Sequence, residues 1–271
     1  MAARLVPLGS GSQGNATLVE LGETRVLVDA GIAARTLTHR LEEIGVEPSS
    51  ISGVFLSHEH GDHTRGAGRF SRRYGVPVLS TVATLEALDR SPVHFDDWRR
   101  VDPGVVVEIG PVRVEPFPVP HDAAQPMGFV LEGEGVRAGI VTDLGHATTL
   151  VVQRLRGCHL LMVEANHDDA MLRDGPYPWQ LKQRVGSRLG HLSNEAAARL
   201  LEQVVDDGCR GVILGHLSEK NNTPELARKT VSRALQRVGH GSVEVQVAER
   251  RSPSRGLTCG AGSVVTPLGR S

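Results

Sequence analysis

Short apolar runs, each with the length of a β-strand, alternate along the chain with turn residues and with stretches of helical period. Gly22 separates the first two runs as in a β-hairpin, and a Gly-Glu-Gly turn at 133–135 divides a later run in the same way. Between the runs, apolar residues recur every three or four positions, as on one face of a helix. We therefore predict strands at 16–21, 24–31, 53–58, 76–80, 105–110, 112–121, 127–145 and 158–166, and helices at 33–44, 64–75 and 82–88.

Clear helix starts follow in the last third of the chain. Ser193 and Thr223 are typical N-cap residues, and Pro224 occupies the first helical position after the second cap. Apolar runs before and after the second of these helices have strand length. The predicted elements are helices at 194–205 and 224–238 and strands at 210–216 and 242–250.

Two stretches lack a clear period. Residues 167–194 contain three turn-rich patches and few apolar residues, so we predict an ordered loop region over a site, with one short helix. Residues 251–271 are rich in Gly, Ser, Pro and Arg, which predicts a disordered tail. The remaining strands and helices predict one α/β domain at 1–250, with mixed sheets inside and helices outside.

Composition narrows the class of protein only slightly. The chain has 271 residues, 39% of them hydrophobic, and a formal net charge of −1, so bulk charge does not favour nucleic acid or membrane. No signal peptide and no apolar run of membrane-spanning length is visible. The three cysteines show no CxxC spacing, which favours reduced thiols. We expect a soluble cytoplasmic protein without membrane association.

The stretch "GVFLSHEHGDHTRG" carries the strongest chemical signal. It places His58, His60, Asp62 and His63 directly after the apolar run 53–56. Imidazole and carboxylate are common ligands of divalent metals, and four of them at this spacing are unusual for a polar surface turn. Because adjacent Asp62 and His63 fit poorly around one ion, two neighbouring metals are favoured over a single one.

Three later residues share one feature, which is that each ends an apolar strand. They are His121, Asp143 and His216, and strand ends that meet at one edge of a sheet build sites in open α/β folds. His146 lies close to Asp143 and is either a supporting residue of this site or a surface residue. Four other histidines do not follow the rule and are expected to be structural or solvated: His39, His94, His159 and His240.

The motif "SHEHGDH" resembles the HxHxDH signature of the metallo-β-lactamase superfamily, and "VLVDAG" resembles an early strand motif whose aspartate, here Asp29, lies beneath the site. The resemblance covers about residues 1–250 and implies an αββα sandwich with two metal ions, zinc or manganese. It also implies a hydroxide shared by the ions as nucleophile. In the superfamily's ligand pattern, His58, His60 and His121 hold one ion, Asp62, His63 and His216 hold the other, and Asp143 bridges them.

Several polar residues surround this predicted centre. His191 precedes a predicted helix N-terminus, where free amides attract anions, and it is a candidate proton donor to a leaving alkoxide. Three basic residues precede His191: Lys182, Arg184 and Arg188. Their side chains either contact the phosphate backbone of a nucleic acid or form a solvated face. The expected catalytic residues are Asp62, Asp143 and His191. Three residues at the end of the predicted strand 158–166 are expected to reach the same edge: Glu164, Asn166 and His167. The expected substrate contacts are Ser10, Asn15, Asn166, His167, Ser193 and Asn194.

Further stretches resemble one bacterial family in particular. "LGSGSQGNA", "HDAAQPMGF", "EANHDDAML", "YPWQLKQRV", "GHLSNEAAA" and "LGHLSEKNNTPELA" look like those of the YycJ/WalJ-type metallo-hydrolases. That resemblance implies a DNA exonuclease that works 5′ to 3′, with DNA as partner and a role in DNA repair. The segment between Asp143 and His216 is too short for an added domain, so a compact hydrolase with an exposed groove is expected.

Two other functions remain open at this stage. A small-molecule hydrolase, such as a cyclic phosphodiesterase or lactonase, would use the same metal ligands. A metal-binding adaptor without catalysis would also keep a folded centre. The presence of all seven candidate ligands favours an enzyme over the adaptor, and the basic stretch before His191 favours DNA over a small substrate.

Overall fold

The computed structural model describes residues 2–88 and 93–260. In these ranges the chain forms two sheets of seven strands each. The first sheet has the order β14-β1-β2-β3-β4-β5-β6 and is antiparallel near β1 and parallel from β3 onward. Its strands are β1 (Ala2–Gly9), β2 (Ala16–Leu21), β3 (Thr24–Val28), β4 (Ile51–Phe55), β5 (Val78–Ser80), β6 (Trp98–Arg100) and β14 (Leu257–Gly260).

The second sheet has the order β13-β12-β11-β10-β9-β8-β7. Its first half in sequence is an antiparallel meander, and β10, β11, β12 and β13 then run parallel. Its strands are β7 (Val107–Ile109), β8 (Val112–Pro118), β9 (Met127–Gly133), β10 (Val136–Val141), β11 (Leu160–Glu164), β12 (Gly211–Gly215) and β13 (Glu244–Val247).

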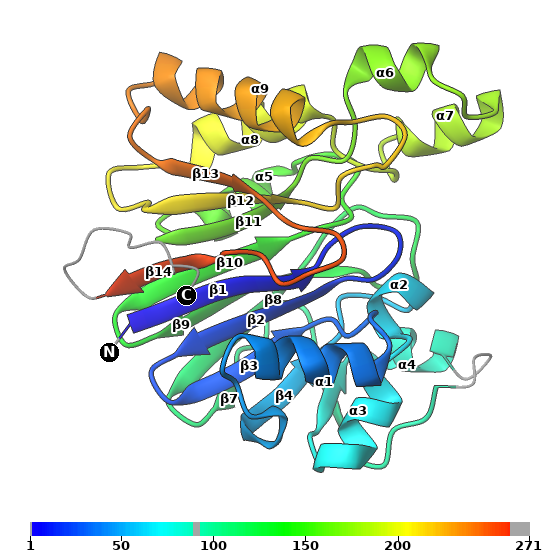
Figure 1. Cartoon of the computed structure of the whole chain (residues 1–271), viewed down its shortest axis with the longest axis vertical. Coiled ribbons are helices and arrows are strands. Elements are labelled where there is room, and N and C mark those ends of the chain that lie inside the picture. The colour runs from blue at the N-terminus through cyan, green and yellow to red at the C-terminus, as the bar shows by residue number, and fades with distance from the viewer. Residues whose placement is uncertain (1, 89–92, 261–271) are drawn as a thin grey trace.

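Helices cover the outer faces of both sheets, as Figure 1 shows with α8 and α9 at the top and α1 and α3 at the bottom. The caps predicted at Ser193 and Thr223 are confirmed, since both side chains accept a backbone N–H of the following helix. The helices are α1 (Ala34–Glu43), α2 (Gly61–Thr64), α3 (Ala67–Tyr74), α4 (Val82–Leu88), α5 (Thr149–Leu155), α6 (Asp169–Asp174), α7 (Trp179–Val185), α8 (Asn194–Val204) and α9 (Pro224–Arg237), with a 3₁₀ turn at η1 (Pro48–Ser50).

Three apolar layers hold these elements together. Phe55 of the first sheet and Phe129 of the second meet edge to face between the sheets, with ring centroids 5.7 Å apart. Phe70 of α3 belongs to the layer outside the first sheet, and Leu201 of α8 belongs to the layer outside the second. The predicted αββα sandwich is therefore confirmed.

Parallel strands of both sheets end at the same edge of the sandwich. At this edge, an acidic or histidine residue ends or follows each of five strands: β3 and β4 in the first sheet, and β10, β11 and β12 in the second. Ligand sites of open α/β folds form at such carboxyl ends. The edge therefore gathers Asp29, His58, Asp143, Glu164 and His216 from distant parts of the chain.

Three expectations from the sequence are corrected by the fold. The region 167–194 contains two short helices, α6 and α7, where one was expected. The helix α5 and the strands β1 and β6 were not predicted. The tail predicted to be disordered from 251 onward is ordered through 260, because β14 pairs with β1 and extends the sheet beyond 250. The rest of that tail, 261–271, lies outside the described residues. None of the described helices has both the length and the apolarity needed to cross a bilayer.

Candidate metal centre

The loop after β4 brings the histidine motif to the edge of the sandwich. The turn of α2 begins at Gly61, and its first residues present Asp62 and His63 on the inner side. The backbone of Gly31 packs directly against it, and a Cβ atom on Gly31 would overlap the carbonyl of Asp62. Asn15 N–H also donates to this carbonyl at 2.7 Å. Close backbone packing therefore fixes the direction in which the motif residues point.

Three imidazoles form the first group of candidate ligands. One nitrogen each of His58, His60 and His121 lies within 4.8 Å of the others. His58 Nε2 and His60 Nδ1 are 3.0 Å apart, and His121 donates its Nδ1–H to the carbonyl of Gly190 at 3.1 Å. This donation leaves His121 Nε2 free to bind a cation, as in many metal sites.

A second group lies beside the first. Asp62, His63 and His216 each offer one atom within 4.8 Å of the others. The Asp62 Oδ2 atom is 3.7 Å from His63 Nε2 and 3.6 Å from His216 Nε2. These two groups contain the same residues that the sequence resemblance assigns to the first and the second metal ion.

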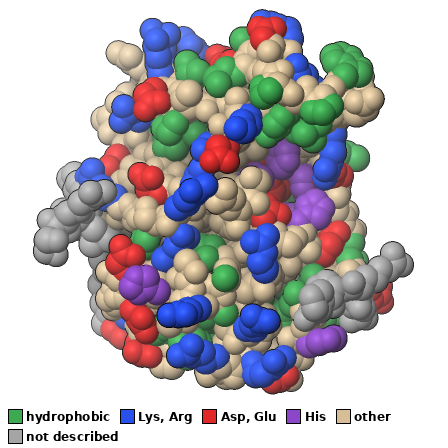
Figure 2. All heavy atoms as spheres, turned by 45° about the vertical axis from the view of Figure 1, so that its right-hand side comes forward, with side chains coloured by type: hydrophobic (Ala, Val, Ile, Leu, Met, Phe, Trp, Pro, Cys, Tyr) green, Lys and Arg blue, Asp and Glu red, His purple; other side chains and the backbone are tan. Residues whose placement is uncertain are grey.

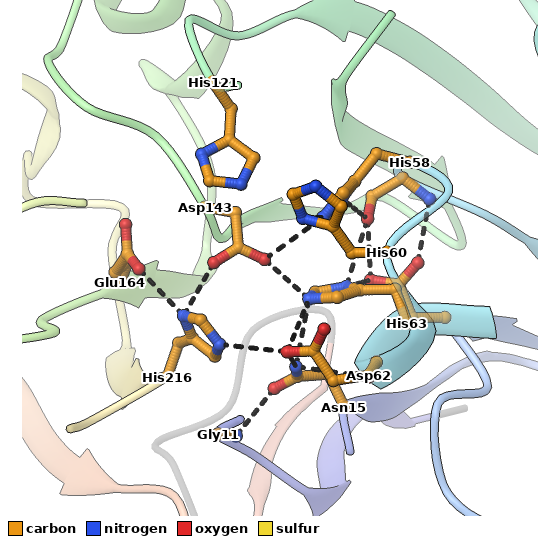
Figure 3. Close-up of polar contacts among 12 residues, drawn as sticks. Gly11, Asn15, His58, His60, Asp62, His63, His121, Asp143, Glu164 and His216 are labelled. Carbon is orange, nitrogen blue, oxygen red and sulfur yellow. Dashed lines mark hydrogen bonds and ion pairs between the residues drawn. The ribbon is translucent and has the colours of Figure 1, made fainter. Parts of the chain in front are cut away.

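Asp143 lies between the two groups, with His216 on one side and His58 and His63 on the other (Figure 3). Its Oδ1 atom is 2.6 Å from His216 Nδ1, and its Oδ2 atom is 2.6 Å from His63 Nε2. Yet neither oxygen has a hydrogen-bond partner of acceptable geometry among the described residues. A buried carboxylate ringed by imidazoles without proper hydrogen bonds fits the bridging position between two cations.

The backbone at the centre is strained at the strand ends. Asp29, Asp143 and His216 have φ values of 63°, 53° and 54°, a region that residues other than glycine rarely adopt. Among the described residues, the other non-glycine residue with positive φ is Glu134, in a hairpin turn. Strain of this kind concentrates at functional sites, where the surrounding structure holds it in place.

Asp29 supports the centre from below, as the sequence indicated. Its Oδ2 atom is 2.7 Å from His63 Nδ1, and its carboxylate also accepts the N–H and hydroxyl of Ser57 at 2.8 and 2.9 Å. The hydrogen bond at Nδ1 fixes the ring so that Nε2 of His63 points toward Asp143. Carboxylate–histidine pairs of this type orient metal ligands and raise their basicity.

Glu164 is a central residue that the sequence places near this edge without indicating a role for it. It is buried at the end of β11, and its Oε1 atom is 2.7 Å from His191 Nδ1 and 2.9 Å from His216 Nδ1. Its Oε2 atom accepts the backbone N–H groups of Leu144 and Leu192. The sequence signal that could have assigned Glu164 to the site is its position as an acidic residue at the end of an otherwise apolar strand. A buried carboxylate at such a position needs hydrogen-bond or ionic partners.

Charges at the centre shift the pKa values of its histidines in opposite directions. Burial lowers the pKa of His58 and His121 and leaves both neutral. For His63, burial is outweighed by the carboxylates of Asp29 and Asp143, which raise its pKa to about 10. For His191, burial is outweighed chiefly by Glu164, which raises its pKa to about 9.

The buried carboxylates are ionised for the same reason. Burial favours the neutral acid at Glu164, but His191 and His216 outweigh it and lower the pKa of Glu164 to about 2. At Asp143, burial is likewise outweighed by His216 and His63, so its pKa lies well below the usual range. Negative charge accumulated around the imidazoles is what a pair of divalent cations would neutralise.

The centre opens into a cavity of about 420 Å³. Of the residues predicted to touch substrate, Asn166 lines this cavity, as does the predicted proton donor His191. Arg184 also lines it, although its guanidinium pairs with Asp122 at 2.6 Å. The other walls include Tyr177, Leu181, Val185, Ser218, Glu219 and Lys220.

Two predicted substrate contacts lie behind the ligands and do not line the cavity. The Ser10 hydroxyl accepts the backbone N–H of His216 at 2.8 Å. Asn15 accepts the N–H of Gly11 at 2.7 Å, and its Nδ2 atom is 3.0 Å from His63 Nε2. Both are buried, so their observed contacts position the ligands and the glycine-rich turn.

The predicted contacts near α8 are also buried and away from the cavity. Ser193 caps α8 by accepting Ala196 N–H, while Asn194 N–H donates to the carbonyl of His167. The Asn194 side chain pairs with Asn222. The expected anion site at this helix start is therefore wrong, because the fold uses these groups internally.

The remaining basic residues and His146 form local contacts. His146 donates its Nδ1–H to the carbonyl of Arg188 at 3.0 Å and accepts the guanidinium of Arg188 at Nε2 at 3.1 Å. Within the described part of the chain it has no hydrogen bond to a candidate ligand. Lys182 donates to the carbonyl of Arg173 at 2.7 Å. His146 thus holds the loop after α7, which is a structural role.

Comparison with known proteins identifies the family of this chain. Residues 24–216 match the Beta-lactamase superfamily domain. The chain is 34% identical over 253 residues to the exodeoxyribonuclease YycJ of Bacillus anthracis, covering 92% of this chain and 96% of that protein. It is also 34% identical over 232 residues to the exodeoxyribonuclease WalJ of Streptococcus pneumoniae D39, covering 84% of this chain and 86% of that protein.

Solved structures show the same fold. The metallo-β-lactamase fold protein YhfI from Bacillus subtilis superposes with a TM-score of 0.71 at 17% identity, over 94% of this chain and 99% of that one. Zn²⁺-bound PqqB from Methylobacterium extorquens gives 0.69 at 18% identity, over 96% and 99% of the two chains. Together with the sequence match, these observations show that the chain belongs to the metallo-β-lactamase superfamily of hydrolases, in the branch that contains YycJ and WalJ.

Proposed function

We propose that this protein is a metal-dependent phosphodiesterase that hydrolyses DNA, as an exonuclease working from the 5′ end. The observation that supports this most directly is the buried Asp143 carboxylate between two groups of three ligands, at the bottom of an open cavity. The names of its YycJ and WalJ relatives support DNA as the substrate. Reduced, buried cysteines fit a cytoplasmic location, and action on DNA ends fits a role in repair.

Seven residues would hold two divalent cations in this centre. The proposed ligands are His58, His60 and His121 for one ion, Asp62, His63 and His216 for the other, and Asp143 for both. When bound, the ions supply a water of lowered pKa and neutralise charge on the phosphoryl oxygens. Imidazole with carboxylate accepts either zinc or manganese.

Other residues of the chain orient these ligands and move a proton. Asp29 and Glu164 hold the Nδ1 atoms of His63 and His216. His191 is held by Glu164 through Nδ1, which leaves its Nε2 for the cavity that it lines. A histidine kept protonated at neutral pH in this place is suited to donate a proton to the leaving alkoxide.

A small-molecule hydrolase would use the same ligands, so the substrate must decide between the two functions. The direct test is degradation of end-labelled single- and double-stranded DNA by the purified protein with added manganese or zinc. Asp143→Ala removes the proposed bridging carboxylate. Asp97→Ala is the matched control, because it removes an exposed carboxylate that does not line the cavity.

The proposal expects progressive loss of nucleotides from the 5′ end by the wild type and by Asp97→Ala, and no loss by Asp143→Ala. Loss from the 3′ end would overturn the polarity alone. A protein that binds two metals but hydrolyses only lactones or cyclic phosphodiesters would overturn the DNA proposal. Metal binding without turnover on any of these substrates would favour the adaptor.

A further inference from the structure

A row of exposed arginines runs along the outer side of α2 and α3. Its members recur every three or four positions, as residues on one face of a helix do. Arg65 and Gly66, which join the two helices, keep helical backbone angles, so the period continues from one helix into the next. We call this row the arginine stripe, and its members are Arg65, Arg69, Arg72 and Arg73.

Acidic residues leave most of the charge on the stripe unbalanced. Over residues 61–75 the one acidic residue is Asp62, which is a proposed metal ligand. Arg72 pairs with the exposed carboxylate of Asp96 at 3.4 Å. In the described part of the chain, no carboxylate lies within ion-pair distance of the other three guanidinium groups. Because the whole chain has a net charge of −1, the stripe is a local positive surface on a nearly neutral protein.

The neighbouring helix α1 widens this positive surface. Arg35 and His39 of α1 line an open hollow of about 490 Å³ together with Arg73 of the stripe, and Glu42 supplies a carboxylate there. Figure 2 shows Lys and Arg side chains gathered in the lower half of the molecule, below the opening in which histidines are visible. The positive surface therefore spans two helices that pack on the same sheet.

The stripe begins at the rim of the cavity that holds the metal ligands. Asp62 lines this cavity and belongs to the turn of α2, which Arg65 follows directly. The Arg65 guanidinium donates to the carbonyl of Gln13 at 3.3 Å, and the neighbouring Ser12 also lines the cavity. The later members of the stripe do not line it, so α3 leads away from the opening. A long molecule bound in the cavity can therefore continue along the stripe.

We propose that the arginine stripe binds the phosphate backbone of DNA outside the cavity, at nucleotides beyond the bond that is cleaved. Guanidinium groups suit this role because their N–H donors match the oxygens of a phosphate in pairs. A helix rises about 1.5 Å per residue, so Arg65 and Arg73 lie about 12 Å apart along it. This length equals the axial span of about three phosphates on one strand of a duplex. The inference rests on the proposed nuclease function and adds that the enzyme holds a longer stretch of DNA than its cavity.

DNA binding by the Asp143→Ala protein, which is expected not to cleave, tests the stripe. In this background, Arg69→Gln with Arg73→Gln removes two exposed cations that have no carboxylate partner among the described residues. Fluorescence anisotropy with a labelled long oligonucleotide is expected to show a Kd raised about tenfold. The slope of log Kd against log salt concentration should also fall by about 1.4 to 1.8, since each phosphate contact contributes about 0.7 to 0.9.

The matched control is Lys229→Gln with Arg233→Gln in the same background. These two cations are also exposed and four positions apart, but they lie on α9, which covers the other sheet (Figure 1). The control removes the same charge and should leave both the Kd and the salt dependence close to those of the parent. Equal changes in the two double variants would overturn the stripe as a DNA-binding surface. An unchanged Kd after loss of Arg69 and Arg73 would overturn it as well.

Turnover separates this inference from the proposed function. A dinucleotide that places its one phosphodiester at the metal centre has no phosphate left for the stripe. With Asp143 intact, Arg69→Gln with Arg73→Gln should therefore keep kcat/KM for the dinucleotide and lose about tenfold in kcat/KM for a long strand. Equal losses on both substrates would overturn the inference, because the arginines would then act at the cavity. A wild type that hydrolyses neither substrate would overturn the nuclease function, and the binding measurement would still decide the stripe.

Discussion

Asp29 and His63 are joined by a contact of 2.7 Å between a carboxylate oxygen and Nδ1, in a part of the molecule closed to solvent. The carboxylate is held in turn by the backbone and hydroxyl of Ser57. Because this pair fixes the orientation of His63, the direction of one proposed metal ligand depends on a residue that is not itself a proposed ligand.

Replacing Asp29 with Asn is expected to weaken metal binding. If the amide nitrogen faces His63 Nδ1, the ring must carry its proton on Nε2, the atom proposed to bind the cation. Loss of such a supporting carboxylate typically lowers metal affinity about 10- to 100-fold. Titration of zinc into the metal-free protein measures this directly. Asp102→Asn, at an exposed carboxylate paired with Arg100, should leave the affinity unchanged, and an equal loss in both variants would contradict the role of Asp29.

His191→Ala is expected to slow hydrolysis in proportion to how poor the leaving group is. Loss of a positioned acid costs typically about 10²- to 10⁴-fold when the leaving alkoxide needs a proton. The effect should therefore be large on DNA and small on bis(4-nitrophenyl) phosphate, whose leaving group departs as a stable anion. His146→Ala is the control, because His146 hydrogen-bonds to Arg188 and does not line the cavity. Equal losses on both substrates would contradict proton donation.

Metal binding should release protons and strengthen as pH rises. In the metal-free protein, the surrounding carboxylates overcome burial and raise the pKa of His63 to about 10, and that of His216 is raised for the same reason. Both are thus protonated at pH 7, and a cation must displace these protons to bind. Apparent affinity should rise by about tenfold per pH unit for each proton displaced, up to the folded pKa values. Calorimetric titration in buffers of different ionisation enthalpy counts the protons, and an affinity independent of pH between 6 and 9 would contradict this.

Gly31→Ala is expected to distort the histidine motif. A Cβ at Gly31 would overlap the Asp62 carbonyl, whereas a Cβ at Gly61, in the same motif, meets no atom within 4 Å. Gly31→Ala should therefore lose metal and melt at a lower temperature, while Gly61→Ala should keep both properties close to those of the wild type. Metal analysis after gel filtration and thermal unfolding are the measurements. Similar behaviour of the two variants would show that the close approach can relax.

The sequence predicted the sandwich and the ligand candidates because both depend on local patterns. His58, Asp143 and His216 each follow an apolar strand, and parallel strands deliver such residues to one edge. Glu164 follows the same pattern and was recognised only as a residue near that edge, since its partners come from loops that the sequence does not place.

The errors lie where tertiary contacts decide. Ser193 and Asn194 have the chemistry of an anion site, but the packing of α8 turns their groups toward His167 and Asn222. A local pattern shows that a cap exists and cannot show whether the cap faces solvent or the core. Likewise, the composition after 251 indicates disorder, yet β14 becomes a strand because an open edge of β1 is available to pair with it.

The packing of β14 predicts that Leu257 contributes to stability, although it lies beyond the domain end expected at 250. Its side chain is 0% exposed, belongs to the layer between the sheets, and fills the space above Gly211. Leu257→Ala removes buried methyl groups and leaves a cavity, which typically costs about 2–5 kcal/mol in the free energy of unfolding. Denaturant unfolding measures this loss, with Val105→Ala as control because Val105 is 57% exposed. Equal stability of the two variants would mean that β14 is docked too weakly to matter. Metal affinity should stay unchanged in Leu257→Ala, since β14 supplies no ligand to the centre.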